Sequence, residues 1–167
     1  MPPNKIQPIE PIAFPKIEKQ EILPIQPIDT FHLFGNVQSE IQTETLTIAT
    51  TGNSDTYIIC PYTGFLSSVD FSGVDALTTS DTNFITFTIT NLGRGGGGTT
   101  AMLDSGDVNT TKVAGTAISA NTVRELTLSG SLNATRVAKG ERLRIRAAAT
   151  GTLANTVTFA TYLCRFK

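Results

Sequence analysis

The distribution of proline divides the chain into two parts that cannot share one type of structure. Of the eight prolines in the chain, seven lie before residue 30. Proline has no backbone N–H and disfavours helix in the residue before it, so this segment suits neither a helix nor a central strand. The remainder of the 167 residues is enough for one ordinary domain with a hydrophobic core. We therefore expect an extended arm over residues 1–30 and one folded domain over residues 31–167.

The arm carries one pattern twice, Ile-x-Pro-Ile-x-Pro-Ile, at residues 6–12 and again at residues 22–28. A spacing of three is the period of polyproline II, so the isoleucines form one stripe and the prolines a second. A solvated linker is normally rich in Gly, Ser, Glu or Lys and not in isoleucine. We therefore expect the arm to bind the surface of another protein. The expected contact residues are Ile6, Pro8, Ile9, Pro11, Ile12, Phe14, Ile22, Pro24, Ile25, Pro27 and Ile28.

Beyond the arm, the sequence predicts short strands. A short apolar cluster at residues 31–34, FHLF, is expected to be the hinge where the arm docks on its own domain. The clearest strand pattern is residues 83–92, where Ile85, Phe87 and Ile89 face one way and polar residues alternate with them. Further strands are expected at residues 39–50, 56–60, 65–72, 112–117, 122–129, 142–149 and 156–166, with turns at residues 51–55 and 138–141.

This strand count predicts the fold class. About eight short strands separated by turns are typical of an all-β sandwich. A jelly-roll-like sandwich is favoured, because eight strands in two Greek keys fit the count. No segment beyond the arm shows a helical period over eleven residues.

Three arginines alternate with apolar residues in the expected strand at residues 142–149. Arg142, Arg144 and Arg146 should point outward while the residues between them point into the core. Such a row is either a solvated face that pairs with carboxylates such as Glu125 and Glu141, or a subunit interface, where arginine is enriched.

The composition offers little for chemistry or for charged partners. A net charge of −1 gives no electrostatic case for nucleic acid or for an anionic membrane. The single histidine, His32, lies in the hinge cluster, and no His/Cys/Asp cluster has metal-ligand spacing. Cys60 and Cys164 both lie in strand-like segments and are expected to be buried thiols, although a disulfide between them stays open. We expect no catalytic residue, no metal and no cofactor.

Two further features of the sequence concern a phosphate-binding loop and a membrane segment. The glycine-rich residues 93–98, GRGGGG, lack the lysine and Ser/Thr of a phosphate-binding loop and are expected to be a flexible loop at the rim of the sandwich. No signal peptide and no run of eighteen apolar residues is found in the sequence, so we expect no membrane association.

Three segments together resemble a known family. They are residues 67–93 (SSVDFSGVDALTTSDTNFITFTITNLG), residues 138–159 (AKGERLRIRAAATGTLANTVTF) and the terminal YLCRF. This part of the chain, roughly residues 40–167, is similar to the small jelly-roll head decoration, or cement, proteins of tailed bacteriophages. The resemblance implies trimers or dimers on the outside of an icosahedral shell, with terminal arms that reach over neighbouring coat subunits. It implies no catalytic residues, and the arm lies outside it.

The expected function is that of a structural virion protein that decorates and stabilises a phage capsid. It would be made in the host cytoplasm and located on the capsid surface, with the major capsid (coat) protein and further copies of itself as partners. One alternative is a receptor- or glycan-binding head that its arm attaches to a phage fibre or tail, since jelly rolls also serve as lectins. The absence of Trp and the presence of only three Tyr weaken that alternative. A hydrolase would require two carboxylates that converge in a pocket.

Overall fold

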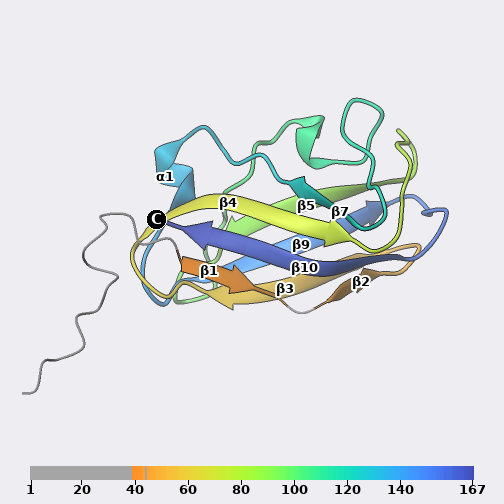
Figure 1. Cartoon of the computed structure of the whole chain (residues 1–167). Helices are drawn as coiled ribbons and strands as arrows, with labels where there is room; N and C mark the ends of the chain where they lie inside the picture. The colour runs from red at the N-terminus through yellow and green to blue at the C-terminus, as the bar shows by residue number, and fades with distance from the viewer. Residues whose placement is uncertain (1–38, 44) are drawn as a thin grey trace, which may run out of the picture.

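The computed structural model describes residues 39–43 and 45–167. These residues form ten strands and two short helical turns (Figure 1). The strands are β1 (Ser39–Gln42), β2 (Leu46–Ile48), β3 (Asn53–Ile59), β4 (Gly64–Gly73), β5 (Phe84–Asn91), β6 (Thr100–Ala101), β7 (Thr122–Glu125), β8 (Arg136–Val137), β9 (Arg142–Thr150) and β10 (Val157–Phe166). The helical turns are the 3₁₀ turn η2 (Asp107–Asn109) and the helix α1 (Leu132–Thr135). The expected arm, the hinge cluster and His32 lie outside the described residues.

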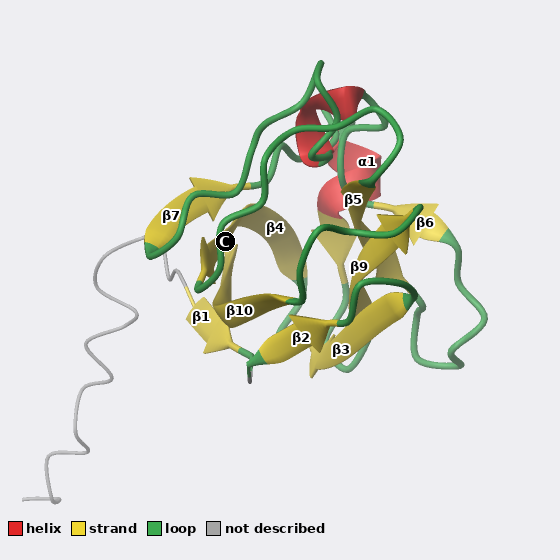
Figure 2. Cartoon of the chain, turned by 90° about the vertical axis from the view of Figure 1, so that its right-hand side faces the viewer, coloured by secondary structure: helices red, strands yellow, loops and turns green. Residues whose placement is uncertain are grey.

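The strands form two antiparallel sheets that face each other (Figure 2). One sheet has the order β1-β10-β4-β7, with β2 also paired to β10 and β8 to β4, and the other has the order β3-β9-β5-β6. The pairs β2–β10, β3–β9, β4–β7 and β5–β6 are nested along the chain, as in one long hairpin wrapped around a core. This nesting is the jelly-roll topology, and the predicted fold class is confirmed.

Alternating side chains fill the space between the sheets. Ile85, Phe87 and Ile89 of β5 are at most 2% exposed, as their spacing predicted. Phe87 packs against the rings of Phe71 from β4 and Phe159 from β10, with ring centroids 4.7 and 5.6 Å away. These three rings come from both sheets, so they hold the two sheets together at the centre of the core.

Several expected element boundaries differ from the structure. Residues 112–117 were expected to form a strand, but they form a loop held by short-range hydrogen bonds such as Gly115 N–H to Lys112 O, so this prediction was wrong. Residues 53–55 were expected to belong to a turn and instead begin β3, because Gly52, with φ of +99°, makes the reversal one step earlier. The tight turn at residues 138–141 is confirmed by the hydrogen bond from Glu141 N–H to Ala138 O.

Both ends of the described chain lie at one end of the sandwich (Figure 1). Ser39, the first described residue, pairs with Phe166 at the end of β10. Lys167 is tied to the start of β4, because it exchanges two backbone hydrogen bonds with Phe65. The described chain therefore begins at the end of the sandwich where β3 and β10 finish.

Candidate functional site

The outer surface of the β3-β9-β5-β6 sheet brings together the arginine row and the edge strand β3. Arg142, Arg144 and Arg146 point outward from β9, as predicted, since Leu143, Ile145 and Ala147 between them are at most 1% exposed. The register of the two strands places one β3 residue beside each arginine. We call the resulting set the arginine face; its members are Asp55, Tyr57, Ile59, Arg142, Arg144 and Arg146.

At one end of the arginine face, Arg146 and Asp55 form a bidentate ion pair. Arg146 Nε lies 2.6 Å from Asp55 Oδ1, and Nη2 lies 2.7 Å from Oδ2. These hydrogen bonds lower the pKa of the Asp55 carboxyl and raise that of the Arg146 guanidinium. Planar two-point contacts of this kind fix the geometry of both side chains.

At the other end, Arg142 stacks on an aromatic ring and adjoins the glycine-rich loop. The guanidinium carbon of Arg142 lies 5.2 Å from the centre of the Tyr57 ring. A Cβ at Gly96 would come within 2.9 Å of Arg142 Nη2, so the loop at residues 93–98 approaches the arginine through a residue that has no side chain. Tyr57 and Ile59 remain 51% and 67% exposed.

Arg144 occupies the middle of the arginine face without a complete set of hydrogen bonds. It sits opposite Tyr57 of β3 and Thr90 of β5. Its Nε is buried and has no hydrogen-bond partner among the described residues. Its charge helps to lower the pKa of Asp55, but the oxygens of Asp55 are hydrogen-bonded to Arg146. A buried charged donor of this kind is unusual in folded proteins.

The carboxylates expected beside the arginine row lie elsewhere. Glu125 is on β7 of the opposite sheet, where it pairs in register with Asp70. Glu141 accepts hydrogen bonds from Asn91 Nδ2 and from the backbone of Ala138, which lower the pKa of its carboxyl. The pairing with Glu125 and Glu141 was therefore a wrong expectation, because strand register and not sequence distance determines the neighbours of β9.

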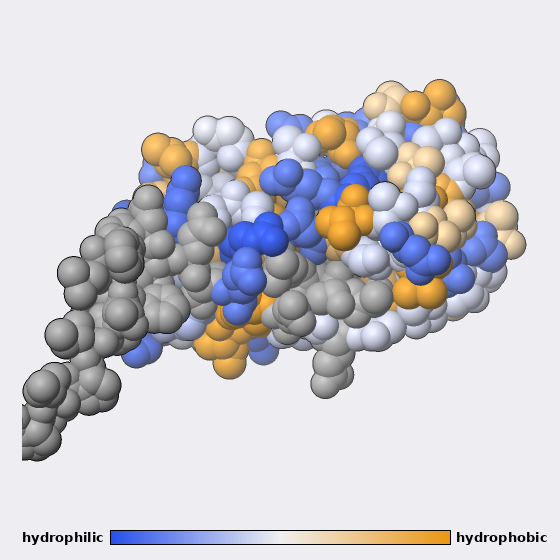
Figure 3. All heavy atoms as spheres, in the orientation of Figure 1, coloured by the Kyte–Doolittle hydropathy of each residue, from blue (hydrophilic) through white to orange (hydrophobic). Residues whose placement is uncertain are grey.

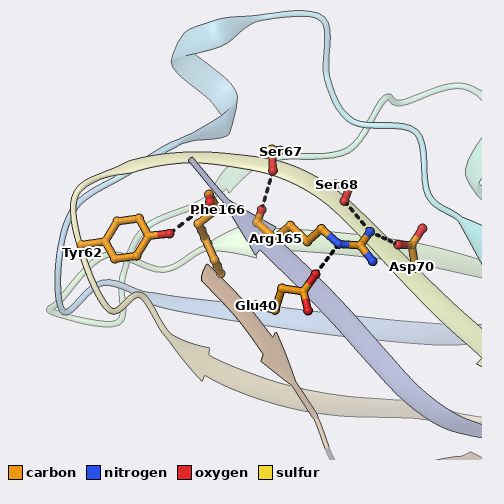
Figure 4. Close-up of polar contacts among 7 residues, drawn as sticks. All are labelled: Glu40, Tyr62, Ser67, Ser68, Asp70, Arg165 and Phe166. Carbon is orange, nitrogen blue, oxygen red and sulfur yellow. Dashed lines mark hydrogen bonds and ion pairs between the residues drawn. The ribbon is translucent and has the colours of Figure 1, made fainter. Parts of the chain in front are cut away.

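The outer surface of the other sheet, which we call the acidic face, has the opposite charge balance. Among the described residues it carries Glu40, Asp70 and Glu125 and two arginines, Arg165 on β10 and Arg136 on β8. Arg165 Nε lies 2.7 Å from Glu40 Oε1, and Nη1 lies 2.5 Å from Asp70 Oδ2 (Figure 4). Hydrophilic side chains gather over β10 and β4 on this side of the molecule (Figure 3). Arg165, Glu40 and Asp70 therefore satisfy one another.

Part of the acidic face is exposed and unpaired. Glu125 forms no ion pair with any described residue, and Val123 beside it on β7 is 67% exposed. The two faces of the sandwich therefore differ in the sign of their surplus charge.

A second candidate site is a pocket beside β5, on the side where β5 pairs with β6. It has a volume of about 280 Å³ and lies between β5, β6 and the segment from Leu103 to Thr110. The Asn109 side chain at its wall is already used, since its amide binds the backbone of Asp104 and Thr127. Only Phe87 contributes a ring to the lining, and that ring belongs to the core.

Cys60 and Cys164 are buried free thiols. Burial raises the pKa of Cys60 to about 11 and that of Cys164 to about 12, so both stay protonated at neutral pH. Within residues 39–43 and 45–167, no group of three or more His, Cys, Asp or Glu side chains is placed to hold a metal ion. No helix in the described part of the chain is long and apolar enough to cross a bilayer.

The alternation of residues 142–149 predicts the three outward arginines but not the residues of β3 that lie beside them. Tyr57 and Ile59 alternate with the buried Ile58 and Cys60, and this alternation is the signal that could have placed them outward. Asp55 was assigned to a turn, so its pairing with Arg146 had no basis in the sequence.

Comparisons with protein-family models, with curated proteins and with solved structures found no match to this chain.

Proposed function

We propose that this protein is a structural virion protein that decorates and stabilises the capsid of a tailed bacteriophage. Its N-terminal arm clamps neighbouring coat subunits, and its jelly roll sits on the outer surface of the shell. Copies of the protein associate as a homo-oligomer, a trimer in preference to a dimer. The protein has no catalytic role in this proposal.

The observation that carries the proposal is the double Ile/Pro repeat, joined to a domain with a hydrophobic core of its own. Among the described residues, this core runs from Leu46 to Phe166. An extended arm of 28 residues would reach about 85 Å, which exceeds the width of one small domain. Several arms on one oligomer would bind tightly through effective concentration even if each arm bound weakly.

Deletion of residues 1–29 tests the proposal. The truncated chain should retain the circular-dichroism spectrum and the cooperative unfolding of a β-domain. It should no longer co-sediment with phage capsids that lack their decoration protein, whereas the full chain should bind them. Failure of the full chain to bind would defeat the decoration function. Full binding by the truncated chain would defeat only the role of the arm.

A receptor- or glycan-binding head is the alternative function, and the pocket beside β5 is the observation in its favour. Its open wall carries Asp104 and Ser105, polar groups that a sugar hydroxyl can contact. Binding to a glycan array that is lost in a Ser105→Trp variant, with capsid binding absent, would favour this function over decoration.

A further inference from the structure

The edge strand β3 presents exposed apolar side chains next to charge that the described residues do not balance. β3 pairs with β9 on one side only, and Tyr57 and Ile59 are more than half exposed. The arginine face holds three arginines and a single carboxylate, Asp55. Aromatic and arginine side chains that cluster in this way are enriched at the centres of protein interfaces.

Arg144 indicates the chemistry of the occupant. Its guanidinium forms no ion pair with any described carboxylate, and its Nε has no hydrogen-bond partner among the described residues, although nearly all buried donors in folded proteins have one. A guanidinium binds a carboxylate most favourably, through short charge-assisted hydrogen bonds. The arginine face is therefore suited to a segment that combines apolar side chains with a carboxylate.

The second Ile/Pro repeat has this composition. Residues 21–29, EILPIQPID, contain Glu21 and Asp29, three isoleucines and no lysine or arginine. In polyproline II the isoleucines of this segment share one edge, which leaves the carboxylates free to bind arginine. The first repeat, residues 6–12, carries only Glu10. The second repeat is thus the better match for the arginine face.

The second repeat is also close enough to reach the arginine face of its own chain. Asp29 lies ten positions before Ser39, so the two residues are at most about 36 Å apart when the chain between them is extended. Ser39 pairs with Phe166, and the carbonyl of Phe166 accepts a hydrogen bond from the hydroxyl of Tyr62, three residues after Ile59. The start of β1 and the end of β3 lie at the same end of the sandwich (Figure 1). A short tether of this kind gives a high effective concentration at the face.

We propose that residues 21–29 dock on the arginine face of the same molecule, with their isoleucines on Tyr57 and Ile59 and a carboxylate at Arg144. This contact covers part of the apolar stripe while the protein is free. Under the proposed function, coat subunits would then compete with the arginine face for the arm. The docking itself requires no coat protein, so it can be tested separately from the decoration function.

Cysteine cross-linking in the full-length chain tests the docking. The test variant carries Ile25→Cys and Ile59→Cys. The matched control carries Ile25→Cys and Val123→Cys, because Val123 is also 67% exposed on a strand but lies on the opposite face. The native thiols should give little background, since burial keeps them protonated. Under mild oxidation of the dilute protein, the test pair should form an intrachain disulfide at least about tenfold faster than the control pair.

A charge reversal then tests the role of Arg144. Adding Arg144→Glu to the test pair should slow intrachain cross-linking at least about threefold, and high salt should slow it in the chain that retains Arg144. If Ile59→Cys disturbs folding, Tyr57→Cys serves as the second attachment point. Equal rates for the test and control pairs would overturn the proposal. Disulfides found only between chains, as a dimer band on a non-reducing gel, would overturn docking within one molecule.

Discussion

The two outer faces of the jelly roll are built from the same kind of strand but differ in how their charges are satisfied. On the acidic face, Arg165 joins Glu40 and Asp70, so one cation ties β1, β10 and β4 together. On the arginine face, Arg146 forms an ion pair with Asp55, and Arg142 stacks on the ring of Tyr57. The Nε of Arg144 has no hydrogen-bond partner among the described residues. Arg165 of the acidic face is therefore paired within the chain, whereas Arg144 of the arginine face forms no ion pair with a described residue.

This difference indicates that the acidic face contributes to the stability of the fold and that the arginine face is available to bind another segment or protein. A satisfied ion pair contributes modestly to folding and leaves little capacity to bind another molecule. A buried charged donor without a partner costs folding free energy, and a guanidinium that forms no ion pair beside exposed apolar side chains is available for a partner. We therefore expect substitutions on the two faces to change different measurements.

The largest effect should come from the core that both faces share. Phe87→Ala should lower the free energy of unfolding by about 3–5 kcal/mol, because it opens a cavity among three packed rings. Urea denaturation measures the loss. The neighbouring exposed Thr88→Ala should change stability by less than about 0.5 kcal/mol. Equal losses for the two variants would show that the jelly-roll core is wrongly placed.

A smaller effect is expected at the ion pair of the arginine face. Asp55→Asn should cost about 0.2–1 kcal/mol at neutral pH, because a pair whose side chains are 30% and 23% exposed is partly screened by solvent. The pKa of Asp55 is lowered in the folded state, so its contribution is present above the ordinary value of 3.8 and is lost as the pH falls through the folded pKa. The variant should accordingly lose less stability than the native chain on acidification. Thermal unfolding at several pH values checks this.

Asp107→Asn provides the comparison for that measurement. Asp107 pairs with Lys112 at 2.9 Å, but both side chains are more exposed than those of Asp55 and Arg146. Its loss should change stability by less than the loss of Asp55. The reverse order would contradict the importance assigned to the bidentate geometry of Asp55 and Arg146.

The smallest effect on folding is expected at Arg144. Arg144→Gln should not lower the free energy of unfolding by more than about 0.5 kcal/mol, since it removes a buried donor that has no partner among the described residues. Arg165→Gln should lower the melting temperature further, because it breaks two ion pairs on the acidic face. Calorimetry of the two variants compares the faces directly. A larger loss at Arg144 than at Arg165 would mean that the arginine face serves folding.

The alternation of apolar and polar residues along the sequence predicted most of the strands, but it did not predict most of the residues of the arginine face. Alternation in β5 and β9 predicted which residues are buried, because a strand places successive side chains on opposite faces. Residues 112–117 form a loop and not a strand, because their backbone bonds close a turn, as from Gly115 N–H to Lys112 O, and Val113 N–H binds the side chain of Asp81 instead of a neighbouring strand. The neighbours of the arginine row depend on the pairing of β3 with β9, across more than 80 residues of sequence. Strand pairing of that range has no local signature.

The central claim is that the isoleucine stripe exists to bind another protein. Its most direct test is co-sedimentation of a full-length chain in which Ile9, Ile12, Ile25 and Ile28 are each replaced by Ser, with Val123→Ser as the control for an exposed apolar residue. The account predicts that the control binds undecorated phage capsids like the native chain and that the quadruple variant loses binding and no longer protects them against heat. Native binding and protection by the quadruple variant would contradict it.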